Sequence, residues 1–501
     1  MAGLLAVALA GCAALVGAHP DQVVISRATP IAPAPEWRPE GVGVYPAVPV
    51  RVSLCRVEGT IEGTIGFELW LPARWNGRLL GAGVGGDAGV YNYADMSRRI
   101  AEGFATVTTD SGHKESQARW MADPKARMDY EHRAVHLTAQ AAKRLIGAFY
   151  AQPVKHSYYL GCSGGGRQAL KEMQVYPADY DGVVAGAPGP SMPLQSVRMM
   201  WFSLLQKKQP EGALSDADWL LYERRVTAHC DSDDGVRDGI ISDPLRCRFD
   251  MRTLLCKPGQ GAECLTAPKL AMLEAIVAPM TDEEGKPMDS GLFPGVRTRP
   301  GPPSPLLRAM WADGVYDDPA WNEDGFQRTR DLAAANRIMP ELRADRVTID
   351  PFIQRGGKAI LYQGWADPST NAGPTIGYYT ALAGANGGLK KTGENVRLFL
   401  VPGMYHCGRG PGADAFGGSN HQSWPDDPRR DILWALIDWT ENGRAPERLV
   451  ATKLVDGKER FTRTLCPFPK AARYDGKGPI DEASSYRCET DPELAARLTA
   501  E

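Results

Sequence analysis

The sequence lacks an excess of charge of either sign. It carries 57 lysines and arginines against 60 aspartates and glutamates, a formal net charge of −3 at pH 7. Binding to phosphate backbones or to anionic bilayers requires a basic surface. We therefore expect no nucleic-acid partner and no electrostatic attachment to a membrane.

Other features are also missing. Beyond the first residues there is no long apolar run, so the sequence predicts no integral membrane span. The ten cysteines form no Cys-x-x-Cys pair and no Cys/His pattern, which argues against a zinc site. No internal repeat or low-complexity tract is present. A chain of 501 residues with 43% hydrophobic residues is nevertheless ample for a buried core.

The amino-terminal residues resemble an export signal. Leu4 to Val16 is apolar, and Val16-Gly17-Ala18 offers a small-residue cleavage site, which predicts a signal peptide over residues 1–18. Leu9-Ala10-Gly11-Cys12 also resembles a bacterial lipoprotein signal, in which Cys12 would carry a lipid anchor. No lysine or arginine precedes the apolar stretch, so a signal that begins upstream stays open. The protein is expected to be secreted or periplasmic, with a membrane-anchored lipoprotein as the alternative.

The cysteines fit an oxidising compartment, where they would form disulfide bonds. Pairing between sequence neighbours predicts three of them: Cys230–Cys247, Cys256–Cys264 and Cys466–Cys488. If Cys12 leaves with the signal, nine cysteines remain, and Cys55 is then the candidate without a partner.

Strand-like and helix-like segments alternate along much of the chain, which predicts an α/β protein with a parallel sheet covered on both faces. Strand-like alternation is expected over residues of about 50–72, most clearly at 65–71. The other expected strands are residues 78–80, 104–109, 158–160, 181–187, 358–362 and 396–401, and the expected helices are 130–150, 167–175 and 430–439. The pattern degrades over residues 191–345, which hold four of the cysteines and many acids. We predict a catalytic domain built from residues 45–190 and 346–495, with 191–345 inserted as a lid domain.

Residues 161–165 read Gly-Cys-Ser-Gly-Gly, which fits the G-x-S-x-G pattern, with an expected strand before it and a helix after it. Ser163 would stand on a strained turn, and glycines on either side would let other backbone come close. The helix that follows would point N–H groups at developing negative charge, and Gly164 supplies the first of them. The alternatives are an ordinary glycine-rich loop or a phosphate loop, but no Lys-Ser/Thr follows at the spacing of the latter. The context predicts an α/β-hydrolase fold with Ser163 as nucleophile.

Such a serine needs a base and an orienting acid, which follow it in the order Ser, Asp, His in this fold class. Past Ser163 the histidines are His229, His406 and His421. Only His406 comes just after an expected strand, and Asp367 follows another. The predicted catalytic residues are therefore Ser163, Asp367 and His406.

Cys162 precedes the serine and Cys407 follows the histidine. This Cys-Ser…Asp…His-Cys set resembles the tannase/feruloyl esterase family, which also includes mono(2-hydroxyethyl) terephthalate hydrolases. Further blocks carry the resemblance over roughly residues 50–490; they lie at 75–78, 104–113, 180–188, 401–404 and 466–467. The resemblance implies a disulfide between Cys162 and Cys407 that ties nucleophile to base. It also implies Gly86 as the second oxyanion donor beside Gly164, with Gly85 as the runner-up.

The resemblance extends to residues 230–240, which are similar to the family's calcium loop. It implies a structural calcium ion as the only cofactor. The ligands would be the side chains of Asp231, Asp234 and Asp238 and the backbone carbonyls of Val236 and Ile240. No glutamate stands at the twelfth position of an EF-hand. The alternative is an acid-rich turn held by its own hydrogen bonds.

Together these features predict a secreted serine esterase that acts on a small-molecule ester through an acyl-enzyme. That the acyl group is aromatic, whether feruloyl, galloyl or a terephthalate monoester, is implied by the resemblance alone. Two other functions stay open: a general carboxylesterase for short esters, and a binding protein built on a catalytically dead hydrolase fold.

Overall fold

The computed structural model describes residues 11–40, 45–260, 263–298 and 302–496. The chain divides into two compact units, Met1–Gly186 with Ile349–Ala359, and Ala187–Thr348 with Ile360–Glu501. Most of the predicted signal peptide, residues 1–10, lies outside the described residues. In the part of the chain that the structure covers, no helix has the length and apolarity needed to cross a membrane.

The first unit is built on a mixed sheet with the strand order β1-β2-β5-β6-β8-β7-β9-β10. Its strands are β1 (Gly17–His19), β2 (Val23–Ile31), β5 (Leu54–Ile61), β6 (Ile65–Pro72), β7 (Arg78–Ala82), β8 (Ala105–Thr109), β9 (His156–Cys162) and β10 (Gly182–Gly186). The sheet is antiparallel from β1 to β8, whereas β7 runs parallel to β8 and β9, and β10 parallel to β9. A separate antiparallel pair joins β3 (Ala34–Trp37) and β4 (Val48–Val50).

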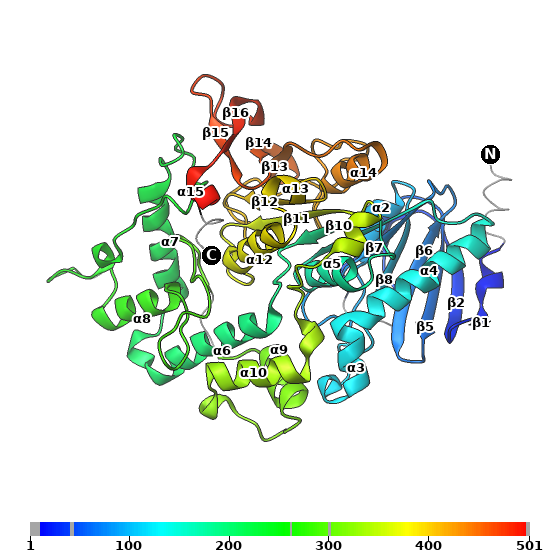
Figure 1. Cartoon of the computed structure of the whole chain (residues 1–501), viewed down its shortest axis with the longest axis horizontal. Coiled ribbons are helices and arrows are strands. Elements are labelled where there is room, and N and C mark those ends of the chain that lie inside the picture. Colours follow the sequence, from blue (N-terminus) through cyan, green and yellow to red (C-terminus); the bar gives the residue numbers. More distant parts are fainter. Residues whose placement is uncertain (1–10, 41–44, 261–262, 299–301, 497–501) are drawn as a thin grey trace. The chain divides into compact units, whose positions relative to one another are not determined.

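Helices cover this sheet because its strands are apolar on both faces; every residue of β6, for example, is buried. The helices are α2 (Tyr93–Ile100), α3 (Pro124–Met128), α4 (Ala134–Tyr150), α5 (Gly164–Val175) and α11 (Asp350–Gln354). Figure 1 shows α4, in cyan, lying along the strands, and its apolar side chains Ala141, Leu145 and Ile146 join the core beneath it. This is the α/β-hydrolase fold, as predicted.

The expected strands and helices of the first unit are present, with two differences. The helix predicted from residue 130 begins as a π turn, Asp129–Arg133, before α4 continues it. Strands β1 to β4 were not predicted, because residues 17–50 combine an apparent leader with prolines that disfavour a strand assignment. Most of these strands lie at the edge of the sheet or outside it, where proline is tolerated.

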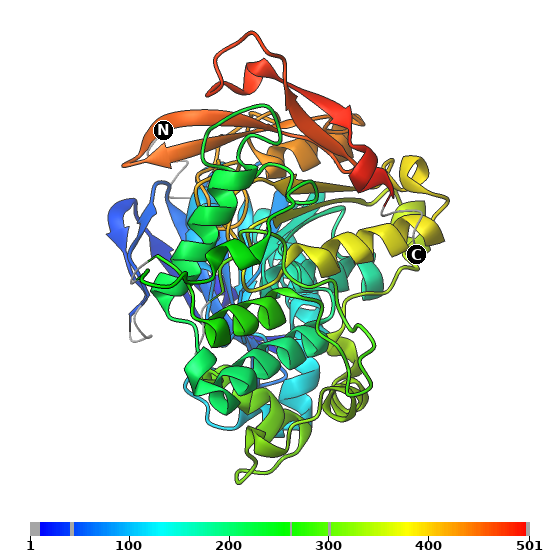
Figure 2. The ribbon, with the colours of Figure 1, turned by 90° about the vertical axis from the view of Figure 1, so that its left-hand side faces the viewer.

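The second unit contains β11 (Lys358–Gly364, of which the first two residues belong to the first unit) next to β12 (Val396–Val401). Two antiparallel hairpins follow, β13 (Leu449–Val455) with β14 (Lys458–Leu465) and β15 (Lys470–Tyr474) with β16 (Tyr486–Thr490); Figure 2 shows them in orange and red. Its helices are α6 (Met192–Lys208), α7 (Asp216–Cys230), α8 (Ala267–Val277), α9 (Pro305–Ala309), α10 (Arg328–Ile338), α12 (Ala372–Ala385), α13 (Leu389–Thr392), α14 (Ile432–Asn442) and α15 (Pro492–Ala496). The predicted lid, residues 191–345, spans α6 to α10 and their loops, and its role as a lid stays a prediction.

Four disulfide bonds lie within the units. Cys230–Cys247, Cys256–Cys264 and Cys466–Cys488 are the three that sequence neighbours suggested. The fourth joins Cys12 to Cys55, which the sequence left without a partner. Cys12 is fully buried in the core beneath α4.

The Cys12–Cys55 bond bears on the expectations for the amino terminus. A sulfur atom in a disulfide cannot also carry a lipid thioether, so the Cys12–Cys55 bond and a lipid anchor at Cys12 are alternatives, and the anchor stays a prediction. Cleavage after Ala18 would remove Cys12 together with part of β1, which pairs with β2. The bond and cleavage after Ala18 are therefore alternatives, and both the signal peptide over residues 1–18 and export of the protein stay predictions.

We predict that Cys12 remains in the exported protein and is bonded to Cys55. Closing a loop of 43 residues stabilises by about 4 kcal/mol in the chain-entropy model, so Cys12→Ala with Cys55→Ala should lower the free energy of unfolding by up to that amount. Peptide mapping without reduction tests the bond. An exported chain that starts after residue 12, or that carries a lipid on Cys12, would contradict the prediction.

Candidate active site

Ser163 occupies the turn between β9 and α5 in the first unit. Its backbone has φ 60° and ψ −125°, a conformation that non-glycine residues rarely adopt. Two hydrogen bonds hold the turn: the Ser163 N–H donates to the Gly186 carbonyl at 2.9 Å, and the Ser163 carbonyl accepts from the Arg167 N–H at 2.9 Å. Such a strained strand–turn–helix geometry presents a nucleophilic side chain at the end of a sheet.

The glycines around Ser163 are required by close backbone contacts. A Cβ atom on Gly161 would lie 2.4 Å from the Gly165 carbonyl oxygen, and one on Gly164 would lie 2.8 Å from the Gly86 carbonyl oxygen. A Cβ atom on Gly165 would meet Gly83 at 3.0 Å. The loop of residues 83–86 therefore lies directly against the first turn of α5.

This contact brings both predicted oxyanion donors into one region. Gly164 is the first residue of α5, so its N–H has no acceptor within the helix and sits at the positive end of the helix dipole. Gly86 is exposed and has a φ of 62°, and Gly85 beside it is exposed as well. Their assignment as donors stays a prediction.

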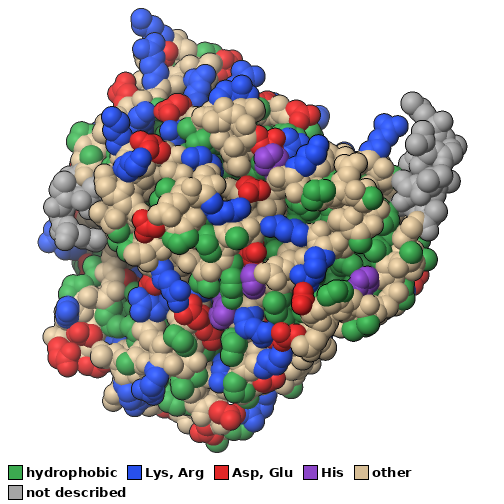
Figure 3. All heavy atoms as spheres, turned by 45° about the vertical axis from the view of Figure 1, so that its right-hand side comes forward, with side chains coloured by type: hydrophobic (Ala, Val, Ile, Leu, Met, Phe, Trp, Pro, Cys, Tyr) green, Lys and Arg blue, Asp and Glu red, His purple; other side chains and the backbone are tan. Residues whose placement is uncertain are grey.

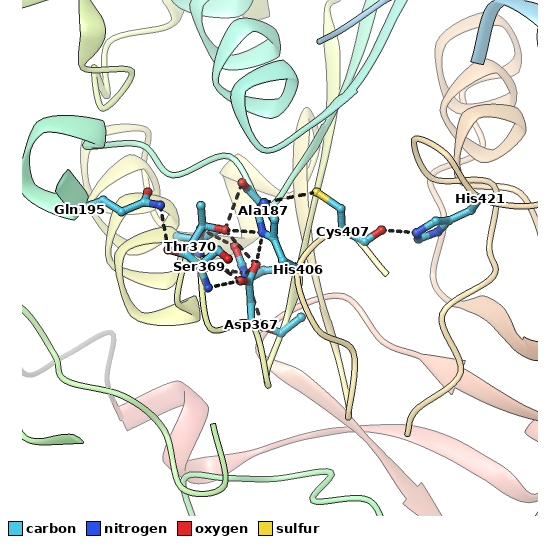
Figure 4. A network of polar contacts seen from close by, with 11 residues as sticks. Ala187, Gln195, Asp367, Ser369, Thr370, His406, Cys407 and His421 are labelled. Carbon is cyan, nitrogen blue, oxygen red and sulfur yellow. Dashed lines mark hydrogen bonds and ion pairs between the residues drawn. The ribbon is translucent and has the colours of Figure 1, made fainter. Parts of the chain in front are cut away.

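Asp367 and His406 meet in the second unit, on the loops that follow β11 and β12. Asp367 Oδ2 lies 2.9 Å from His406 Nδ1 (Figure 4). The Asp367 side chain is fully buried, whereas 27% of the His406 side chain is exposed. An imidazole held through Nδ1 by a buried carboxylate leaves Nε2 to accept a proton, which is the arrangement of a general base.

The Asp367 carboxylate accepts more hydrogen bonds than the one from His406. Oδ1 accepts the backbone N–H groups of Ser369 and Thr370 at 2.8 and 3.0 Å. Oδ2 accepts the Thr370 hydroxyl at 2.8 Å and the Gln363 amide at 3.0 Å. These donors compensate for the lost solvation of a buried charge. No sequence pattern indicates the roles of Thr370 and Gln363.

The loop that carries His406 is held from the other side by His421. His421 Nε2 is hydrogen-bonded to the carbonyl oxygen of Cys407, whose φ of 58° is again unusual for a non-glycine residue (Figure 4). The Cys407 sulfur lies 3.8 Å from His406 Nε2. His421, which no expected strand precedes, therefore contacts the loop of the predicted base without being that base. His229, the other histidine after Ser163, contacts the Arg248 carbonyl.

The structure thus brings Asp367 and His406 together. Ser163, Gly86 and Gly164 belong to the first unit, and the approach of Ser163 to His406 stays a prediction.

A cavity of about 470 Å³ opens beside His406 within the second unit. Its lining combines apolar and polar side chains; they include Met199, Phe202, Ser203, Gln206, Arg297, Thr298, Pro302, Ser304, Leu307 and Tyr405. The Tyr405 hydroxyl is hydrogen-bonded to Glu223, and burial together with this contact raises the pKa of Tyr405 to about 12. Arg297 pairs with the same carboxylate, Oε2 of Glu223, at 3.4 Å.

The acid-rich loop of residues 230–240 folds around the carboxylate of Asp231. Its Oδ1 accepts three backbone N–H groups at 3.0, 2.8 and 3.2 Å, from Asp238, Gly239 and Ile240. Asp238 pairs with Arg463, and burial raises the pKa of Asp234. Within the described ranges, no group of three or more acidic, histidine or cysteine side chains is arranged to hold a metal ion. The five predicted calcium ligands therefore stay a prediction.

Known proteins resemble this chain over nearly all of its length. The profile of the family described as tannase and feruloyl esterase matches residues 49–303 and 309–489. A probable feruloyl esterase B-1 of Aspergillus terreus is 32% identical over 88% of this chain and 87% of its own length. Feruloyl esterase C of Talaromyces stipitatus is 31% identical over 88% of this chain and 86% of its own. Feruloyl esterase B from Aspergillus oryzae, a solved structure, has a TM-score of 0.90 at 27% identity and covers 97% of this chain and 100% of its own.

We predict that the Thr370 hydroxyl stabilises the buried Asp367 carboxylate. Thr370→Val keeps the shape but removes the donor, and should lower the free energy of unfolding by about 1–3 kcal/mol. Thr370→Ser keeps the hydroxyl and should lose only about 0.8 kcal/mol for the missing methyl group. Urea denaturation measures both, and equal stabilities of the two variants would contradict the prediction.

Proposed function

Because the chain belongs to the tannase and feruloyl esterase family, and is therefore a carboxylic ester hydrolase, we propose that it cleaves esters of small aromatic acids through an acyl-enzyme on Ser163. The observation that carries the mechanism is the 2.9 Å contact between the buried Asp367 carboxylate and His406. It supplies an oriented base for a serine that already stands on a strained turn after β9.

The chemistry follows from these groups. His406 Nε2 takes the proton of the Ser163 hydroxyl as the serine oxygen attacks the ester carbonyl carbon. The carbonyl oxygen becomes an oxyanion, which accepts hydrogen bonds from the N–H groups of Gly164 and Gly86. The C–O bond to the alcohol then breaks, and His406 gives its proton to the departing oxygen. Water attacks the acyl-enzyme with the same assistance, which releases the acid and restores Ser163.

Asp367 holds the imidazole and stabilises the positive charge that His406 gains. Four further donors already face its two oxygens and restrain the carboxylate. The proposed role of Asp367 is therefore electrostatic and positional.

The cavity beside His406 supports an aromatic acyl group. Phe202, Met199 and Leu307 provide apolar walls, and hydroxyl groups of Ser203, Thr298 and Ser304 could meet ring substituents. A volume of about 470 Å³ exceeds what an acetyl group fills. On the face shown in Figure 3, basic and acidic side chains are interspersed, which fits a small substrate better than a charged polymer.

A panel of three esters tests the substrate class. We expect higher kcat/KM for methyl ferulate or methyl gallate than for p-nitrophenyl acetate. Preference for the acetate ester would favour a general carboxylesterase, and no turnover of any of the three would favour a catalytically dead binding protein.

We also propose that the protein works outside the cytoplasm. The support is its disulfide content: every cysteine, all of them within the described residues, is disulfide-bonded. Such bonds persist in oxidising compartments.

Ser163→Ala should abolish ester hydrolysis and leave the fold intact, because it removes one partly buried hydroxyl from an otherwise unchanged turn. Turnover of methyl ferulate measures the loss, and the circular dichroism spectrum with the melting temperature checks the fold. Residual activity above about a thousandth of the original would exclude Ser163 as the nucleophile.

We further propose that Cys162 and Cys407 are bonded to each other. Both are disulfide-bonded, and the other eight cysteines are accounted for by four bonds. Since the two cysteines adjoin Ser163 and His406 in sequence, such a bond would hold nucleophile and base at a constant distance.

Removing this bond should reduce rate more than stability. Cys162→Ala with Cys407→Ala is expected to lower kcat on the order of a hundredfold, because a displacement of about 1 Å has that effect. The control is Cys256→Ala with Cys264→Ala, which opens a disulfide remote in sequence from the catalytic residues. Equal kcat for both double variants, or a peptide map with Cys162 bonded to a different cysteine, would contradict the proposal.

The loop of residues 230–240 is proposed to bind a structural calcium ion. The support is the chemistry of its donors, three carboxylates and two backbone carbonyls, since calcium prefers six to eight oxygen ligands. Arg463 would have to release Asp238 for all three carboxylates to take part.

If the loop binds calcium, chelation should lower the melting temperature, and Asp234→Asn should lower it without further response to the chelator. Asp233→Asn, an exposed residue of the same loop outside the ligand set, should behave like the unmodified protein. Differential scanning calorimetry with metal analysis after dialysis measures both. Protein free of calcium with an unchanged melting temperature would show that the loop is a plain acidic turn.

A further inference from the structure

We infer that Tyr130 and Arg167 are positioning residues that hold the Gly85–Gly86 loop against the nucleophile helix α5, so that the two oxyanion donors keep a constant spacing. The inference rests on the serine-esterase mechanism proposed above and adds to it the residues that maintain the oxyanion site.

The loop has few means of its own to keep its shape. Gly85 and Gly86 are exposed and have no side chains. The backbone of Gly86 also lies in the left-handed region. Glycine backbone loses more freedom on ordering than that of any other residue. Yet an oxyanion site works only when its donors are placed in advance at about 2.7–3.1 Å from the oxyanion. The loop therefore needs support from neighbouring side chains.

Tyr130 supplies one support. Its hydroxyl donates to the Gly86 carbonyl oxygen at 3.0 Å, and so restrains the peptide plane that follows Gly86. The ring itself is only 4% exposed and packs edge-on against Trp120 and His113, with centroid distances of 5.0 and 5.9 Å. Burial raises the pKa of Tyr130, which keeps the hydroxyl protonated as a donor. Because the ring is held by its neighbours, the hydrogen bond from its hydroxyl can hold the Gly86 carbonyl in one place.

Arg167 connects Tyr130 to the nucleophile helix. It lies one turn after Ser163, and its guanidinium donates to the carbonyl oxygens of Glu131 and Tyr130 at 2.8 and 3.1 Å. The guanidinium carbon also lies 4.9 Å from the centre of the Tyr130 ring. These carbonyls belong to the π turn before α4, where the regular helical hydrogen bonds are interrupted and carbonyls can accept from side chains.

The burial of the Arg167 side chain costs free energy, which argues against a role in stability alone. The side chain is 1% exposed, and in the part of the chain that the structure describes its guanidinium contacts two carbonyls and the Tyr130 ring but forms no ion pair with a carboxylate. A buried charge without a counter-charge costs free energy. Positioning of the turn that carries Tyr130 accounts for this arrangement.

The next residue of α5 holds the other side of the same loop. Gln168 Oε1 accepts the Val84 N–H at 3.2 Å and the Tyr159 hydroxyl at 2.7 Å, while its amide nitrogen donates to Ser111 Oγ at 3.0 Å. Val84 is thus linked to α5 directly, and Gly86 through Tyr130 and Arg167. Because Gly164 begins the same helix, α5 determines where the loop donor lies relative to the helix donor.

Tyr130→Phe tests the inference by removing one hydroxyl. We expect kcat for methyl ferulate to fall ten- to a hundredfold, KM to change less than about threefold, and the melting temperature to stay nearly constant. Affinity for an arylboronic acid, whose adduct with Ser163 places an oxygen in the oxyanion site, should fall in parallel with kcat/KM. Affinity for ferulate, which forms no such adduct, should not change.

The matched control is Tyr150→Phe. Tyr150 also lies in the first unit, and its hydroxyl also donates to a backbone carbonyl, that of Pro72 at 2.6 Å, at the far end of α4. This variant should keep kcat and boronic-acid affinity. Arg167→Lys, which keeps the charge but cannot span both carbonyls, should show the same kinetic pattern as Tyr130→Phe.

Two results would overturn the inference. One is a Tyr130→Phe protein with unchanged kcat and boronic-acid affinity. The other is a loss of activity that Tyr150→Phe matches, or that accompanies an equal loss of folded protein, since either would mean a structural role only. Failure of the proposed function is recognised separately: a fluorophosphonate would then leave Ser163 unmodified in the unaltered protein, as judged by mass.

Discussion

The close approach of backbone to backbone between residues 83–86 and the first turn of α5 is the constraint on which the nucleophile region depends. It is possible only because Gly83, Gly164 and Gly165 have no side chains; a single Cβ atom on Gly164 would come within 3 Å of the Gly86 carbonyl oxygen. The contact leaves Ser163 in a strained conformation, which the Gly186 carbonyl and the first turn of α5 maintain. A loop without side chains must then be oriented by residues behind it, and α5 itself carries the ones that do so.

In the second unit, the geometry of the site depends on the buried carboxylate of Asp367. The Asp367 carboxylate, which orients His406, is fully buried, and removing a charged group from water costs free energy. Two backbone N–H groups, the Thr370 hydroxyl and the Gln363 amide offset that cost before His406 is considered. Because the carboxylate is satisfied from several directions, its hydrogen bond to the imidazole has a defined geometry. His421, through the Cys407 carbonyl, restrains the same loop on its other side.

Local sequence patterns were sufficient to predict the central elements. The apolar run before Gly161 and the glycines around Ser163 identified β9, the turn and α5, since each depends on neighbouring residues only. Asp367 and His406 could be placed after strands by the same means. The supporting residues could not, because their contacts join distant parts of the chain: Tyr130 and Gly86 are 44 residues apart, and Arg167 and Tyr130 are 37 apart. Nothing in the sequence near Thr370, Arg167 or His421 distinguishes them from other polar residues. The Cys12–Cys55 bond was not predicted for another reason, since the apolar, alanine-rich residues before Cys12 have the composition of a leader.

On the proposed mechanism, rate and substrate choice depend on different stretches of the chain. The nucleophile and both oxyanion donors come from residues 83–86 and 163–164, and their supports from residues 130 and 167–168, all in the first unit. The cavity beside His406 is lined by residues from α6, from 297–307 and from the loops after β11 and β12 in the second. A change in the cavity lining can therefore alter which acyl group binds while the backbone contacts that stabilise the oxyanion stay the same. A substitution in the cavity lining should then change KM by different factors for esters with different ring substituents. Loss of a side chain that supports Gly86 should instead lower kcat by a similar factor for every ester, because all of them form the same oxyanion.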